Sequence, residues 1–216
     1  MFLGNFITFL GEFFIVLSGG FFIGKIGKDF IMRKITLLGD SIRMGYGKIV
    51  PDMLGADYTV FQPTDNCRFS KYTLRGIFDW RNDIEGSDII HWNNGLWDCT
   101  PCVDGNPFTD IDEYVKNMLR IAGLLKEKAK VVIFATTTPV NDNVQYDKNS
   151  LIKEYNKVIV SELTKIGIRI NDLHSLVYPN IDKYICEDNL HMNEQGYEAI
   201  AKQVVDAIKE AEASLR

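Results

Sequence analysis

The chain of 216 residues is 46% hydrophobic and 25% charged, so it holds enough apolar material for one globular domain, alone or with an appendage. Its formal net charge is −5, and its lysines and arginines are scattered along the sequence. This pattern argues against a nucleic-acid partner, because a protein that binds nucleic acid normally carries a basic face.

Residues 1–31 form a hydrophobic N-terminal extension that precedes a domain expected over residues 32–216. The stretch 1–23 has Glu12 as its only charge and is nearly long enough to cross a bilayer as a helix. It lacks a preceding basic region and a clear cleavage site, so a cleaved signal peptide fits poorly. Three alternatives stay open. They are a membrane anchor that leaves the domain in the cytoplasm, an over-extended start with Met32 as the true first residue, and an amphipathic helix packed on the domain.

Beyond the extension, strand-like and helix-like segments alternate. Strands are expected at residues 35–38, 58–61, 88–93, 131–135 and 168–170. Helices are expected within 41–54 and at 72–80, 109–125, 151–163 and 197–208, with Thr109 capping the third, and residues 95–107 read as a long polar loop. Strands that are each followed by a helix predict a three-layer α/β sandwich around a five-stranded parallel sheet with right-handed crossovers.

A tripeptide at the end of the first predicted strand, Gly39-Asp40-Ser41, is the first candidate site. The turn would hold Ser41 at the carboxyl edge of the sheet, where open α/β folds build their sites. Its hydroxyl would be exposed there, with backbone N–H groups of the following helix beside it. On its own the tripeptide is a weak signal, because all three residues are common turn formers.

A second candidate, the pair Asp188 and His191, lies at the entry to the last predicted helix. A serine hydroxyl is unreactive at neutral pH unless a base removes its proton, and this pair can supply the base and the carboxylate that orients it. The chain has 3 histidines. His91 lies inside a predicted strand and is expected in the core, and His174 follows the fifth predicted strand.

Together, Gly39-Asp40-Ser41 and Asp188-x-x-His191 resemble the first and last sequence blocks of the SGNH/GDSL hydrolases, over a span from about residue 32 to the C-terminus. The resemblance implies a flavodoxin-like sandwich with strand order 2-1-3-4-5. It also implies an ester hydrolase in which Ser41 is the nucleophile, His191 the base and Asp188 the group that orients the imidazole. No metal and no organic cofactor are required, and Asp40 is expected to be structural.

The substrate class that the resemblance implies is a small acyl ester. An O-acetyl group on a carbohydrate is preferred, because the sequence shows no long apolar lid. A lysophospholipid or a thioester is the alternative, and it gains weight if residues 1–23 engage a membrane. A non-catalytic member of the fold that binds a glycan is a further alternative.

The donors that would stabilise a developing oxyanion are the weak point of the resemblance. The backbone N–H of Ser41 is one candidate. The family adds a glycine after the second strand, which this chain lacks, and an asparagine in a Gly-x-Asn-Asp block after the third. Gly95 and Asp98 fit that block, but Trp97 stands where the asparagine should be. This departure supports the non-catalytic alternative, whereas the retained Ser41, Asp188 and His191 oppose it.

Neighbouring amides are the substitutes that the sequence offers. Asn94 is the first choice and Asn93 the second, while Asn66 lies near the missing glycine; each could equally be a turn former. Trp97 should lie beside the cleft, where an aromatic face suits a sugar ring or an acyl group, although tryptophan is also a common wall residue. Arg43 either binds an anionic or polyhydroxylated substrate or pairs with a structural carboxylate.

The chain has 4 cysteines, and two of them, Cys99 and Cys102, have the spacing of a redox or metal motif. No second such pair and no nearby pair of histidines completes a zinc site. Free thiols in a reducing cytoplasm, or a local disulfide in the loop, are therefore the simpler interpretations.

Overall fold

The computed structural model describes residues 7–9, 12–17, 20–25 and 32–215, and the chain divides into two compact units, Met1–Met32 and Arg33–Arg216. In the first unit β1 (Ile7–Phe9), β2 (Glu12–Leu17) and β3 (Gly20–Lys25) form an antiparallel sheet in that order. The expected helix, whether membrane-spanning or amphipathic, is therefore wrong for these residues. Phenylalanine, isoleucine and valine favour strands, and the interspersed glycines disfavour a helix. Within the described residues, no helix is long and apolar enough to cross a membrane.

The second unit is built on a five-stranded sheet with the order β5-β4-β6-β7-β8. Its strands are β4 (Arg33–Leu38), β5 (Tyr58–Phe61), β6 (Ser87–Trp92), β7 (Ala129–Ala135) and β8 (Arg169–Asn171). Every neighbouring pair is parallel. The predicted α/β class and the order 2-1-3-4-5 are thus confirmed, and all five carboxyl ends lie at one edge of the sheet.

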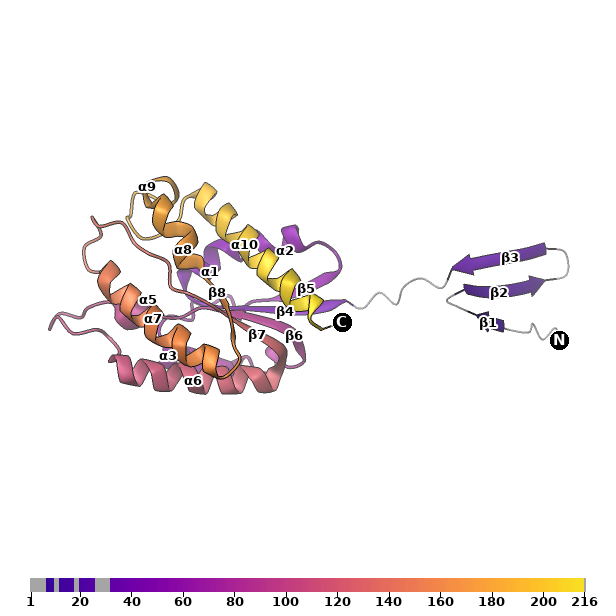
Figure 1. Ribbon diagram of the computed structural model, residues 1–216, viewed down its shortest axis with the longest axis horizontal. Helices are drawn as coiled ribbons and strands as arrows, with labels where there is room; N and C mark the ends of the chain where they lie inside the picture. Colours follow the sequence, from indigo (N-terminus) through magenta and orange to yellow (C-terminus); the bar gives the residue numbers. More distant parts are fainter. Residues whose placement is uncertain (1–6, 10–11, 18–19, 26–31, 216) are drawn as a thin grey trace. The chain divides into compact units, whose positions relative to one another are not determined.

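Helices cover both faces of this sheet (Figure 1). One face carries α3 (Ser70–Asp79), α6 (Ile111–Lys128) and α7 (Asn149–Lys165), with α5 (Leu96–Cys99) nearby. The short helix α4 (Arg81–Ile84) contacts α3, and its Ile84 packs into the core on this face. The other carries α1 (Ser41–Tyr46), α2 (Val50–Leu54), α8 (Leu173–Val177), the 3₁₀ turn η1 (Tyr178–Asn180), α9 (Ile181–Tyr184) and α10 (Glu194–Ala213). Successive strand residues alternate between two cores, so that Leu38 packs with the α6 side and Leu37 with the α10 side. Burial on both faces explains why these strands are almost uniformly apolar.

Two local predictions differ from the structure. The helix expected to be capped by Thr109 begins one residue later, because the carboxylate of Asp110 accepts the N–H of Asp112 at 2.9 Å. The side chain of Thr109 instead hydrogen-bonds Asp98. The loop expected over residues 95–107 contains the short helix α5, which lies against α7. The first difference comes from a local cap by Asp110, and the second from the packing of α5 against α7.

Candidate active site

Ser41 is the first residue of α1, three residues beyond the end of β4. The turn between them requires glycine at position 39, because a Cβ there would lie 2.0 Å from Oδ1 of Asn93. Asp40 is the N-cap, and its Oδ1 accepts the N–H of Ile42 at 3.0 Å. The tight turn and the cap together fix the backbone from which the Ser41 side chain projects.

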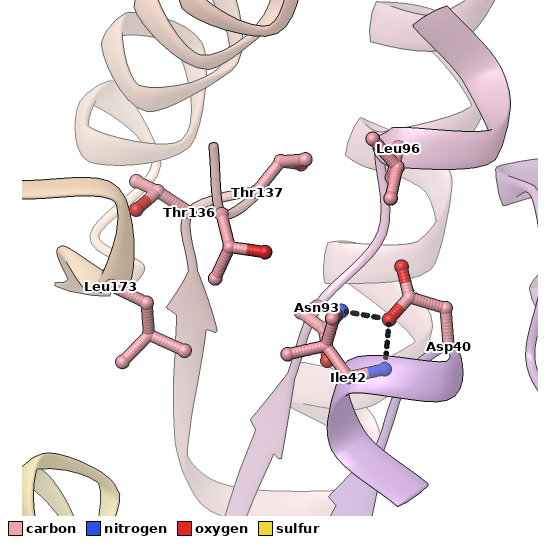
Figure 2. Close-up of a pocket in the computed structure, with 8 residues that line it drawn as sticks. Asp40, Ile42, Asn93, Leu96, Thr136, Thr137 and Leu173 are labelled. Atoms are coloured by element: carbon pink, nitrogen blue, oxygen red, sulfur yellow. Dashed lines mark hydrogen bonds between the residues drawn. The ribbon is translucent and has the colours of Figure 1, made fainter. Parts of the chain in front are cut away.

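Asp40 is held from the neighbouring strand as well (Figure 2). The amide Nδ2 of Asn93, which follows β6, donates to Asp40 Oδ1 at 3.0 Å. Burial raises the pKa of Asp40, and the hydrogen bonds from Asn93 and Ile42 oppose that rise. Asn93, predicted as an oxyanion donor, therefore uses its amide to anchor the turn before Ser41.

His191 and Asp188 lie on a tight loop between α9 and α10. The loop is closed by a bridge between Ile185 and Met192 and by a hydrogen bond of 2.8 Å from Cys186 N–H to the His191 carbonyl. Within it, Asp188 Oδ1 accepts the backbone N–H groups of Leu190 at 2.9 Å and His191 at 2.8 Å. This geometry fixes the carboxylate relative to the imidazole before any substrate binds.

The structure brings Ser41, His191 and Asp188 into one row. His191 Nε2 lies 2.7 Å from Ser41 Oγ, and His191 Nδ1 lies 2.7 Å from Asp188 Oδ2. Partial burial opposes ionisation of Asp188, but hydrogen bonds from Leu190, His191 and Cys186 hold its pKa well below its usual range. An ionised carboxylate can only accept, so Nδ1 carries the proton of the neutral imidazole and Nε2 presents a lone pair to the serine hydroxyl. The row can therefore move the serine proton to the imidazole.

A pocket of about 350 Å³ opens beside this row and includes Ser41 and His191 in its wall. Most of its other lining is apolar: Phe69, Leu96, Trp97, Pro101, Phe108 and Leu190. Trp97 is 43% exposed, so it lies beside the cleft as the sequence predicted. The rings of Phe69 and Phe108, which no sequence pattern singled out, pack 4.7 Å apart between centroids.

The first-choice oxyanion donor, Asn94, does not have a free amide. It is fully buried, its Nδ2 donates to the Arg68 carbonyl at 2.9 Å, and its Oδ1 accepts the indole N–H of Trp92 at 2.7 Å. Asn66 is half-buried, and its Oδ1 accepts the Arg68 N–H at 2.7 Å. Both residues shape the loop after β5, where Arg68 has a φ of 47°. These contacts contradict Asn94 as a donor to substrate.

Arg43 also faces the protein and not the pocket. It is 2% exposed, and its guanidinium donates to the backbone carbonyls of Pro63 at 3.0 Å and Asp65 at 2.6 Å. Neither predicted role, as a substrate ligand or as the partner of a structural carboxylate, matches this arrangement. Arg43 instead ties α1 to the loop after β5.

Gly95 and Asp98 have structural positions as well. A Cβ at Gly95 would lie 2.3 Å from Oγ1 of Thr137, so the chain needs glycine where β6 passes into α5. The Asp98 carboxylate accepts the Ser70 N–H at 2.9 Å and the Ser70 hydroxyl at 2.7 Å. Burial raises the pKa of Asp98 to about 6. Together these residues fix α5, and with it Trp97, against the start of α3.

The cysteines of the CxxC pair are both unpaired. Cys99 is buried, and Cys102 is exposed and lines the pocket. Within the described part of the chain, no group of three or more His, Cys, Asp or Glu side chains could hold a metal ion.

Comparisons with known proteins agree with this fold. No family model matches the chain. The GDSL esterase/lipase CPRD49 of Arabidopsis thaliana is 26% identical over 170 residues, which are 64% of this chain and 66% of that protein. The GDSL esterase/lipase WDL1 of Oryza sativa subsp. japonica is 27% identical over 164 residues, 68% of this chain and 63% of that protein. The chain thus spans less than two thirds of the length of these relatives.

Solved structures show the same architecture. A lipase/acylhydrolase from Enterococcus faecalis superposes with a TM-score of 0.66 at 22% identity, covering 83% of this chain and 96% of that one. The acetyl xylan esterase AlAXEase superposes with a TM-score of 0.64 at 18% identity, covering 81% and 99%. Fold and site define an α/β/α sandwich protein with serine, histidine and aspartate aligned at the carboxyl edge of the sheet. The curated relatives are GDSL esterases/lipases, and the chain resembles them in sequence.

Proposed function

We propose that this protein is a serine esterase that hydrolyses a small acyl ester through Ser41, His191 and Asp188. The observation that carries the proposal is the unbroken row of two hydrogen bonds, each 2.7 Å long, from the Ser41 hydroxyl through the imidazole to the Asp188 carboxylate. A structural histidine would not need both a nucleophile and an orienting carboxylate on opposite ring nitrogens.

The reaction has two halves. In the first, Ser41 Oγ attacks the acyl carbon while His191 Nε2 takes the serine proton, and Asp188 stabilises the imidazolium. The tetrahedral adduct collapses, Nε2 gives the proton to the departing alcohol, and an acyl-serine remains. In the second half His191 takes a proton from water, the hydroxide attacks the acyl carbon, and Ser41 leaves with that proton.

The backbone N–H of Ser41 is the donor that we assign to the oxyanion. Among the described residues it has no hydrogen-bond acceptor, and it lies at the start of α1 next to the hydroxyl that attacks. With Trp97 in place of an amide and Asn94 engaged elsewhere, this site has fewer side-chain donors than the family pattern. One missing donor is worth about 10²–10³ in turnover, so we expect a slow esterase.

An O-acetylated carbohydrate is the substrate that we favour. Support comes from the half-exposed ring of Trp97 beside the nucleophile, since an aromatic face suits a sugar ring. One protein with this fold is described as an acetyl xylan esterase. The apolar lining of the pocket supports the alternative, a longer acyl ester such as a lysophospholipid or thioester. The four unpaired thiols support a reducing cytoplasm as the location.

Hydrolysis of p-nitrophenyl acetate tests the proposal. We expect release of p-nitrophenolate by the unaltered protein and its loss, by about 10³-fold or more, in Ser41→Ala. Ser161→Ala, at an exposed position on α7, is the matched control and should retain full activity. Equal rates in Ser41→Ala and the unaltered protein would leave the non-catalytic, glycan-binding alternative.

A further inference from the structure

Asp147 is a carboxylate in the wall of the pocket that holds Ser41 and His191. It lies in the segment between β7 and α7 and is 8% exposed. No sequence motif includes it, and the reaction described above gives it no role. A carboxylate in a mostly apolar pocket needs hydrogen-bond donors, because burying it without them is unfavourable.

The protein supplies few donors to this carboxylate. Asp147 Oδ1 contacts the hydroxyl of Thr100. That hydroxyl also lies 2.7 Å from the Leu96 carbonyl, so its single proton is divided between two acceptors. Within the described residues, no hydrogen bond reaches the second oxygen, Oδ2, and no cationic side chain pairs with Asp147. A carboxylate can accept about four hydrogen bonds, and most of that capacity is unused.

The rest of the pocket wall indicates which ligand would donate hydrogen bonds to Asp147. Trp97 is 43% exposed and lines the same pocket as Asp147, as do Phe69 and Phe108. The face of an aromatic ring packs against the apolar C–H face of a sugar, and a carboxylate accepts hydrogen bonds from the hydroxyls at the edge of the sugar ring. Ser41 lies in the same wall, so a sugar placed against these groups would have its ester within the reach of the nucleophile.

We propose that Asp147 is a specificity-determining residue that accepts a hydroxyl hydrogen bond from the sugar of an O-acylated carbohydrate. This role rests on the proposed esterase function. Within that function, Asp147 is the residue that recognises the alcohol part of the ester substrate. It predicts that the enzyme distinguishes an ester with a hydroxylated ring from an ester of equal acyl length that has no hydroxyl.

The test is Asp147→Asn, which keeps the shape of the side chain and an oxygen for Thr100 but removes the charge. Kinetics are measured with 6-O-acetylglucose and with p-nitrophenyl acetate. A hydrogen bond to a charged group contributes about 1.5–3 kcal/mol, so the ratio of kcat/KM for the sugar ester to that for the aryl ester should fall about tenfold or more. The loss should come through KM. Asp206→Asn, an exposed carboxylate on α10, is the control and should leave the ratio unchanged.

An equal loss on both esters, or an unchanged ratio, overturns the role of Asp147. Acetylcholine serves as a third substrate because its alcohol part carries a cation. A loss of kcat/KM in Asp147→Asn that is confined to acetylcholine would mean that Asp147 pairs with a cation, and it would also overturn the proposed role. Binding of 6-O-acetylglucose to Ser41→Ala, measured by calorimetry, gives a readout that does not depend on turnover, and adding Asp147→Asn should weaken it by the same factor. Hydrolysis that survives Ser41→Ala counts against the proposed esterase function. The comparison of sugar-ester binding with and without Asp147→Asn tests only whether Asp147 recognises the sugar.

Discussion

Acidification should destabilise the protein through His91, which is fully buried in β6. Its Nε2 lies 3.0 Å from Nδ2 of Asn171, and its Nδ1 lies 3.2 Å from the hydroxyl of Tyr46. The Asn171 amide nitrogen can only donate, so His91 Nε2 must accept this hydrogen bond and carries no proton. Protonation of Nε2 would place two donors against each other. Burial lowers the pKa of His91 from 6.5 to about 3.

The size of the effect follows from proton linkage. A histidine whose folded pKa is depressed binds more protons in the unfolded state, so stability falls as the pH falls below the unfolded pKa of 6.5. At about pH 5 the unfolded chain has gained the proton and the folded protein has not, which corresponds to about 2 kcal/mol at 1.36 kcal/mol per pH unit. This figure holds for any folded pKa below that pH.

Urea unfolding followed by tryptophan fluorescence measures this effect, because Trp92, the residue after His91 in β6, is fully buried. The comparison is with His91→Gln, which keeps a polar side chain but does not titrate. The difference in unfolding free energy between the two proteins should shrink by about 2 kcal/mol from about pH 8 to about pH 5. A difference that stays constant over this range would refute the argument, since the buried imidazole would then not be the titrating group.

Three further outcomes are expected. Asp188→Asn should lower kcat for ester hydrolysis by about 10³–10⁴-fold, because an amide no longer selects the productive imidazole tautomer; a change below tenfold would count against its orienting role. Gly39→Ala should lower the free energy of unfolding by about 1–3 kcal/mol, since its Cβ would lie 2.0 Å from a side-chain oxygen. Gly123→Ala, in a helix with open space around it, should instead stabilise by about 0.5–1 kcal/mol, as urea titrations can show. Cys102 should react with a thiol reagent in the folded state, with loss of activity, whereas buried Cys99, whose pKa is raised by burial, should react only on unfolding.

The fold was largely predictable because its signals are local and strong. Tyr58–Phe61 forms a strand with the predicted bounds, and the apolar run that ends at Ala135 forms an interior strand of the parallel sheet, between β6 and β8. The failures occur where the signal is ambiguous. The N-terminal stretch is apolar without a clear period. Its aromatic and β-branched residues favour strands, and its glycines disfavour the helix that two of the alternatives required.

The site was predictable in part for a similar reason. Ser41 and His191 are marked by short motifs that determine their own turns, and the structure places them together. The binding residues are not marked in this way. Arg43 follows Ser41 by two residues and Asn94 immediately precedes Gly95, but the side chains of both turn into the protein and donate to backbone carbonyl groups. Asp147 comes from a distant loop, so only the packed structure places it in the pocket.

The most direct test of the account is whether His191 activates Ser41. The protein is incubated with an aryl phosphonate that forms a stable bond to nucleophilic serines, and the site of modification is located by mass spectrometry. We expect a single adduct on Ser41 in the unaltered protein, and labelling that is slower by about a hundredfold or more in His191→Ala. Labelling of Ser41 at the same rate in both proteins, or an adduct at another serine, would contradict it.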